Sequence, residues 1–203
     1  MRIPWLLVFL AAGQLHLFSA ESSALFSLEK LAAVSANITT VRLAFTQTKH
    51  LALLDEPLIA TGSMEIDRVH GAMRWEFTGH SILLLRDDRL RRFSANGHEE
   101  SLPDEGGRAA MLAQMHGLMR GDWSALKELF AVTLAADGSP ALICTPKNAD
   151  LSRYLARLEI HFRDDLRGPS SLVLLTADDD RTDYAFGEPE IGIALPPERF
   201  LTP

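Results

Sequence analysis

Apolar and polar side chains alternate with a period of two along residues 41 to 93. The apolar positions of the three clearest segments share one face of the predicted strands: Val41, Leu43, Phe45, Met64, Ile66, Met73, Trp75 and Phe77. This pattern is typical of a half-buried antiparallel sheet. The stretch contains no nucleophile motif, metal-ligand spacing or phosphate-binding loop. It therefore predicts a wide apolar wall that binds a ligand.

The same pattern predicts the order of elements along the chain. An amphipathic helix is predicted from Leu25 to Ser35, and strands near 40–49, 58–67, 72–78, 81–87 and 89–95. The polar residues 98–107 predict a loop, and the helical period of residues 108–129 predicts two short helices broken near Gly121. Strands resume near 130–136, 141–146, 154–163, 170–177 and 181–187, with Tyr154, Ala156, Leu158, Ile160 and Phe162 on one face of the longest. The order predicts one curved sheet with helices laid across its open side, and Phe200 as a last apolar anchor.

The helical insert carries a stripe of methionines at four-residue spacing: Met111, Met115 and Met119, with Leu112 and Leu118 beside them. Residues at this spacing share one helix face. Core packing is one interpretation. The other is an adaptable lid over a cavity, because methionine repacks readily around variable ligands. The position of the insert within a series of strands favours the lid.

The first residues resemble a secretory signal peptide. Arg2 is followed by a mostly apolar run from Ile3 to Phe18, which is shorter than the ~20 residues of a membrane span. Cleavage is predicted after Ala20 or Ala24, and an uncleaved anchor is the alternative. The predicted organisation is therefore a signal peptide at 1–20 and a single domain at 21–203, exported as a soluble monomer.

The composition of the chain argues against several classes of partner and cofactor. The chain has 203 residues, a formal charge of −7 and 47% hydrophobic residues, which argues against a nucleic acid partner. The single Cys144 excludes an internal disulfide, and its apolar strand predicts a buried thiol. The histidines are scattered without metal-ligand spacing, so neither a metal nor a cofactor is predicted.

Several short motifs together resemble the LolA-like family of outer-membrane lipoprotein carriers. In the N-terminal half they are Phe45-Thr46-Gln47, Gly62, Arg68, Trp75, Ser81-Ile82-Leu83 and Asp87-Asp88. In the C-terminal half they are Thr145-Pro146-Lys147 and Pro196-Pro197. Together these motifs extend over nearly the whole predicted mature chain. Their order and spacing resemble those of the family, and the chain is similar to a divergent paralogue of it.

The resemblance implies a mainly β fold with α, an incomplete curved antiparallel β-barrel (half-barrel) covered by lid helices. It implies a periplasmic carrier in a Gram-negative bacterium, whose apolar cavity shields the acyl chains of lipoproteins or other lipids. The implied partners are an inner-membrane export complex and an outer-membrane acceptor. The predicted cargo contacts are Phe45, Met64, Ile66, Arg68, Met73, Trp75, Leu83, Met111, Met115, Leu118 and Met119.

Two positions depart from the family pattern. Arg68 matches a family arginine that helps to hold the lid closed, but Val69 follows it where the family has proline. Its alternative is a solvated arginine at a strand end. Met73 stands where the family often has an aromatic residue. Both departures indicate a paralogue with different cargo.

Three classes of function follow from these observations. The first is a lipid or lipoprotein carrier. The second is a non-enzymatic sensor of lipid or envelope stress, in which the same cavity signals to a membrane partner. The third is a lipid enzyme, but the sequence offers no convergent acid, base or nucleophile, so no enzyme is predicted.

Overall fold

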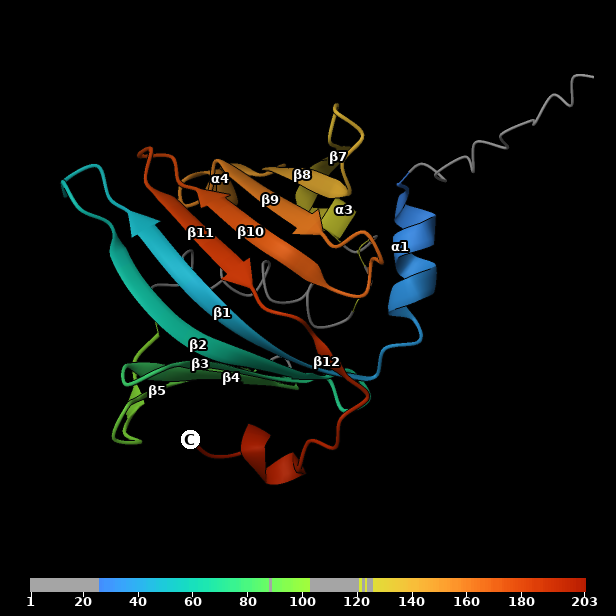
Figure 1. Cartoon of the computed structure of the whole chain (residues 1–203). Helices are drawn as coiled ribbons and strands as arrows, with labels where there is room; N and C mark the ends of the chain where they lie inside the picture. The colour runs from blue at the N-terminus through green and yellow to red at the C-terminus, as the bar shows by residue number, and fades with distance from the viewer. Residues whose placement is uncertain (1–25, 88, 103–120, 122, 124–125) are drawn as a thin grey trace, which may run out of the picture.

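The computed structural model describes residues 26–87, 89–102, 121, 123 and 126–203. They form one twelve-stranded antiparallel sheet in the order β6-β5-β4-β3-β2-β1-β11-β10-β9-β8-β7, with β12 paired to β1. No pairing within this part of the chain joins β6 to β7, so the barrel is open. Figure 1 shows the sheet curving strongly. The predicted incomplete antiparallel half-barrel is thereby confirmed.

The strands follow the predicted order. Their bounds are β1 Thr40–His50, β2 Leu58–Asp67, β3 Ala72–Phe77, β4 Ser81–Arg86, β5 Arg89–Ser94, β6 Glu99–Glu100, β7 Phe130–Leu134, β8 Ala141–Pro146, β9 Arg157–Phe162, β10 Pro169–Leu175, β11 Arg181–Phe186 and β12 Glu190–Ile191. The short β6 lies where the sequence predicted only loop. It forms because two of its residues pair with the edge strand β5.

The prediction for residues 154–163 was wrong at its start. β9 begins at Arg157, and the helix α4 (Ala149–Ser152) and a turn occupy the preceding residues. The Asn148 side chain caps α4 by accepting a hydrogen bond from the backbone N–H of Leu151 at 2.8 Å, which favours a helical turn over a strand here. Tyr154 therefore lies outside the strand, and the longest strand is β1, with 11 residues.

The other described helices are α1 (Leu28–Ser35), α3 (Leu126–Leu129) and the 3-10 helix η1 (Pro197–Phe200). Helix α1 starts later than predicted because the Ser27 hydroxyl accepts from the backbone N–H of Lys30, which makes Ser27 the N-cap. Gly121 has a φ of +61°, which is not helical and agrees with the predicted break. The methionine stripe lies outside the described residues.

Strand register puts the apolar positions on the inner face of the curve. Val41 pairs with Ile66 and Leu43 with Met64, so both strands present apolar side chains to the same side. The core on this face also includes Leu31 of α1, Trp123, and the buried Cys144 of β8. This confirms the predicted burial of the thiol.

The C-terminal segment lies against the outer face of the sheet, beneath β3 and β4 in the view of Figure 1. Phe200 is buried there with Ala72 and Leu195, which confirms it as an apolar anchor. Arg199 also pairs with Glu65 at 2.6 Å, and Arg42 pairs with the same carboxylate at 2.9 Å. The segment therefore covers charged side chains of the outer face and leaves the inner face free.

Among the helices that the structure describes, none is long and apolar enough to cross a membrane.

Candidate functional site

The inner face of the sheet is divided into a packed part and an open part. The packed part surrounds Leu43, Met64 and Met73, whose side chains are almost completely buried. Here α1 and Trp123 close the curve of the sheet. Of the predicted cargo contacts, Met64, Ile66 and Met73 lie in this core and do not line the cavity described next.

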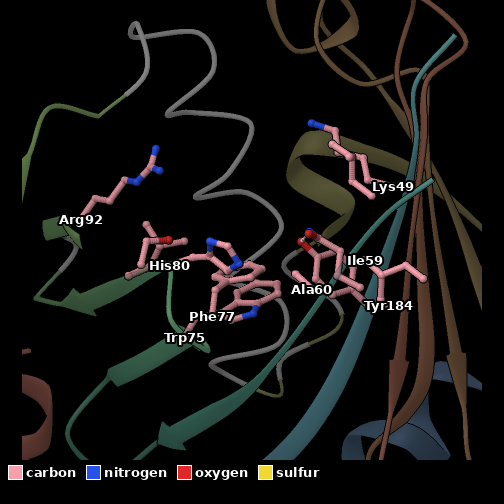
Figure 2. Close-up of a pocket in the computed structure, with 12 residues that line it drawn as sticks. Lys49, Ile59, Ala60, Trp75, Phe77, His80, Arg92 and Tyr184 are labelled. Carbon is pink, nitrogen blue, oxygen red and sulfur yellow. Dashed lines mark hydrogen bonds between the residues drawn. The ribbon is translucent and has the colours of Figure 1, made fainter. Parts of the chain in front are cut away.

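The open part is a cavity of about 600 Å³. It lies over the second half of β1, the first half of β2, and the adjoining parts of β3, β4, β5 and β11 (Figure 2). Its described lining residues are Gln47, Lys49, Leu58, Ile59, Ala60, Trp75, Phe77, His80, Ser81, Leu83, Arg92 and Tyr184. This volume is in the range of cavities that hold small organic ligands.

Aromatic rings form the boundary between the packed core and the cavity. The Phe45 ring makes edge contacts with Trp75, Phe77 and Tyr184, at centroid distances of 5.9, 5.2 and 5.7 Å. Trp75 and Phe77 are stacked with their centroids 6.0 Å apart. Such contacts fix the rings relative to one another. The result is a rigid apolar floor.

Gly62 makes this arrangement possible. A Cβ at position 62 would lie 2.5 Å from the Phe45 ring and 2.0 Å from the backbone oxygen of Glu76. The Phe45 ring therefore lies across β2 where a side chain is missing. This explains in physical terms why the glycine and the phenylalanine occur together in the sequence.

Two side chains of the cavity wall, the half-buried Gln47 and the buried Tyr184, form a polar pair. Gln47 Nε2 donates a hydrogen bond to the Tyr184 hydroxyl. Burial raises the pKa of Tyr184 to about 12, and the hydrogen bond from Gln47 acts in the opposite direction. The phenol is therefore neutral at physiological pH. The Trp75 indole N–H, by contrast, is buried and has no hydrogen-bond partner among the described residues.

The rim of the cavity carries basic groups. Figure 2 shows Lys49 and Arg92 on opposite sides of the pocket, with Trp75, Phe77 and His80 between them. No carboxylate occurs among the described lining residues. Arg92 pairs with Glu100 of β6 at 3.0 Å, whereas Lys49 forms no ion pair with any described residue.

Arg68 lies away from this cavity, directly after β2. Its Nη1 donates to the backbone oxygens of Ser35 and Ile38 at 2.8 and 3.1 Å. A Cβ on Gly121 would lie 2.7 Å from the guanidinium, so the backbone at Gly121 packs onto it. Burial lowers the pKa of Arg68 from its ordinary value. The side chain is thus enclosed by the residues that follow α1, and it is not a solvated strand end.

The structure brings together some predicted site residues and separates others. Trp75 and Leu83 line the cavity, and Phe45 supports its floor. Met111, Met115, Leu118 and Met119 lie outside the described residues. The cavity also uses residues that were not among the predicted cargo contacts: Gln47, Lys49, Leu58, Ile59, Ala60, Phe77, His80, Ser81, Arg92 and Tyr184. Continuing the period of two beyond Phe45 would have found Gln47 and Lys49.

Groups that could support catalysis or metal binding are sparse in the described part of the chain. Searching those residues finds no cluster of three or more His, Cys, Asp or Glu side chains that could hold a metal ion. His80 and Ser81 adjoin the cavity as neighbours in sequence, and among the described residues no side-chain hydrogen bond joins them. The arrangement can bind an apolar molecule and offer it charged and neutral donors.

Neither a scan against protein-family models nor a search of curated proteins found a match. Solved structures with a similar fold include a LolA superfamily protein from Nitrosomonas europaea, at 9% identity and a TM-score of 0.45, covering 85% of this chain and 94% of that chain. An outer membrane lipoprotein-sorting protein domain from Vibrio parahaemolyticus has 10% identity and a TM-score of 0.33, covering 85% and 95%. The MucA/MucB complex from Pseudomonas aeruginosa has 20% identity and a TM-score of 0.37, covering 85% of this chain but only 58% of that chain.

The names of the first two structures are of the kind of protein that the sequence motifs resemble. At TM-scores of 0.45 and below, the likeness carries no argument about what this chain binds.

Proposed function

We propose that this protein binds acyl chains of lipoproteins or other lipids in the cavity of its half-barrel and carries them through the periplasm. The observation that carries the proposal is the cavity of about 600 Å³ with an aromatic floor on the inner face of the sheet. The described lining has no carboxylate. The proposal is therefore for a binding protein and not for an enzyme.

The energetic demand on such a carrier is large. Burying one methylene contributes ~0.8 kcal/mol, so about ten methylenes in the cavity contribute ~8 kcal/mol. A carrier has to offer an apolar surface that buries these methylenes about as favourably as the membrane does. The floor built by Phe45, Trp75 and Phe77 supplies such a surface.

The proposed route of the cargo rests on the predicted signal peptide and on the family resemblance of the sequence motifs. An export signal at 1–20, cleaved after Ala20 or Ala24, would place the domain 21–203 in the periplasm. There it would receive cargo from an inner-membrane complex and deliver it to an outer-membrane acceptor. N-terminal sequencing of the protein purified from periplasm tests the compartment, because an intact Met1 would contradict export.

A charge placed in the cavity tests the binding site. Ala60 lines the cavity on the inner face of β2, and its neighbour Thr61 is exposed on the opposite face. Ala60→Glu should weaken binding of an apolar fluorescent probe at least about tenfold, because binding would bury a carboxylate beside the apolar chain. Thr61→Glu adds the same charge and should leave binding unchanged.

Two results would contradict the proposal. One is equal probe binding by Ala60→Glu, Thr61→Glu and the parent protein. The other is native mass spectrometry of periplasmic protein that finds neither lipid nor acylated protein bound. If lipid binds but is not passed to acceptor membranes, and instead changes binding to a membrane partner, the sensor interpretation replaces the carrier.

A further inference from the structure

The rim of the cavity has a charge opposite to that of the whole protein. The chain carries 27 acidic and 20 basic residues. The described lining nevertheless contains Lys49 and Arg92, together with His80, and no aspartate or glutamate. A purely apolar cargo would not require basic residues, and no acidic ones, around the cavity. The composition of the rim therefore points to a charged part of the ligand.

We propose that the cavity selects an amphiphile with an anionic head group, a carboxylate or a phosphate, and binds its acyl chain on the aromatic floor. The inference rests on the proposed function and names the class of lipid that this site takes. Lys49 and Arg92 hold the head group from two sides, and Trp75 and Phe77 contact the chain.

Strand register fixes both cations on the inner face. Lys49 is the partner of Leu58 across β1 and β2, and Arg92 is the partner of Leu83 across β4 and β5. Leu58 and Leu83 both line the cavity. The two basic side chains therefore extend from the cavity wall, not from the outer surface, and Figure 2 shows them facing each other across the pocket.

The two cations differ in their availability. Lys49 is half-buried and forms no ion pair with a described residue, so no described carboxylate competes with an anion for its three donors. Arg92 pairs with Glu100, and both side chains are about two-fifths exposed. A surface pair of this kind contributes little to stability. An anionic head group can thus take the place of Glu100, with two parallel hydrogen bonds from the guanidinium.

Matched single-chain ligands test the inference. Dodecanoate, dodecyl phosphate, dodecanol and inorganic phosphate should be compared by competition with an apolar fluorescent probe, below their micelle concentrations. Dodecanoate and dodecyl phosphate should each bind at least about tenfold more tightly than dodecanol. Inorganic phosphate alone should not compete. The preference should decrease as sodium chloride is raised, because salt screens the head-group contacts.

Two variants separate the role of the rim from general electrostatics. Lys49→Met keeps the apolar stem and should remove most of the difference in affinity between the anionic ligands and dodecanol. Arg181→Met is the control, since Arg181 lies on the outer face at the start of β11 and pairs with Asp183 at 2.7 Å. It changes the net charge equally and should keep the preference.

The possible results separate a failure of the anionic head-group selection from a failure of the proposed lipid-binding function. Equal binding of dodecanol and dodecanoate, unaffected by Lys49→Met, would overturn the anionic selection and leave the lipid-binding cavity intact. Competition by inorganic phosphate alone would also overturn it, because the site would then be a simple anion site. Binding of no acyl ligand at all would remove the proposed function itself.

Discussion

Arg68→Leu is the most informative single substitution in this fold, because one guanidinium joins three segments. Nη1 donates to the backbone oxygens of Ser35 and Ile38, at 2.8 and 3.1 Å. The Ser35 hydroxyl accepts from the Trp123 indole N–H at 3.0 Å, and the backbone at Gly121 packs on the guanidinium. Leucine keeps the apolar contacts of the stem and removes every donor.

The magnitude follows from the bonds lost. Two hydrogen bonds from a charged donor contribute roughly 1.5–3 kcal/mol each, about 3–6 kcal/mol together. The desolvation of a largely buried guanidinium, which also lowers its pKa, offsets part of this gain. We expect the free energy of unfolding to fall by about 2 kcal/mol.

Urea denaturation followed by Trp fluorescence measures this loss. Arg89→Leu is the control, since Arg89 is exposed and a surface substitution changes stability by less than about 0.5 kcal/mol. Hydrogen exchange should show the extra opening at the amides of α1. A stability and a hydrogen-exchange rate equal to those of the Arg89→Leu control would refute the reasoning.

Three further predictions follow from other parts of the structure. Gly62→Ala should destabilise the protein by about 2 kcal/mol or more, because its Cβ would lie 2.0 Å from a backbone oxygen of β3; Gly187→Ala, whose nearest contacts would be at 3.7 Å, should change the urea midpoint far less. Burial raises the pKa of Cys144 from 9.0 to about 12, so the unfolded state loses its thiol proton first and stability should fall as pH rises from about 9 towards 12; the native thiol should also resist a thiol reagent at pH 7, and rapid labelling without denaturant would contradict its burial. Arg199→Ala should lower the free energy of unfolding by about 1–3 kcal/mol, since it removes one of two partners from the buried Glu65 carboxylate; calorimetry showing no change in Tm would exclude this role.

The order of strands was predictable because local signals act over a few residues. The alternation through Val41, Leu43 and Phe45 is retained in β1 as a buried face. The turn after β5 is also a local feature, since Gly97 has a φ of +81° and its N–H donates to the Ser94 oxygen at 3.0 Å. The prediction from the sequence was wrong before β9, where the single side chain of Asn148 starts a helical turn.

The candidate site was only partly predictable. Trp75 and Leu83 were selected from their apolar character and do line the cavity. Met64 and Met73 were selected for the same reason and lie in the packed core. Apolar character alone cannot distinguish these two environments, since both are built from the same face of the same strands.

The sequence by itself determined which side of each strand is apolar, because side chains alternate with a period of two within a single segment. Only the tertiary structure decided where that face is packed and where it is open. Gln47 meets Tyr184 across 137 residues of sequence, and Lys49 and Arg92 reach one cavity from different strands. These meetings depend on the pairing and curvature of the whole sheet, which no local pattern contains.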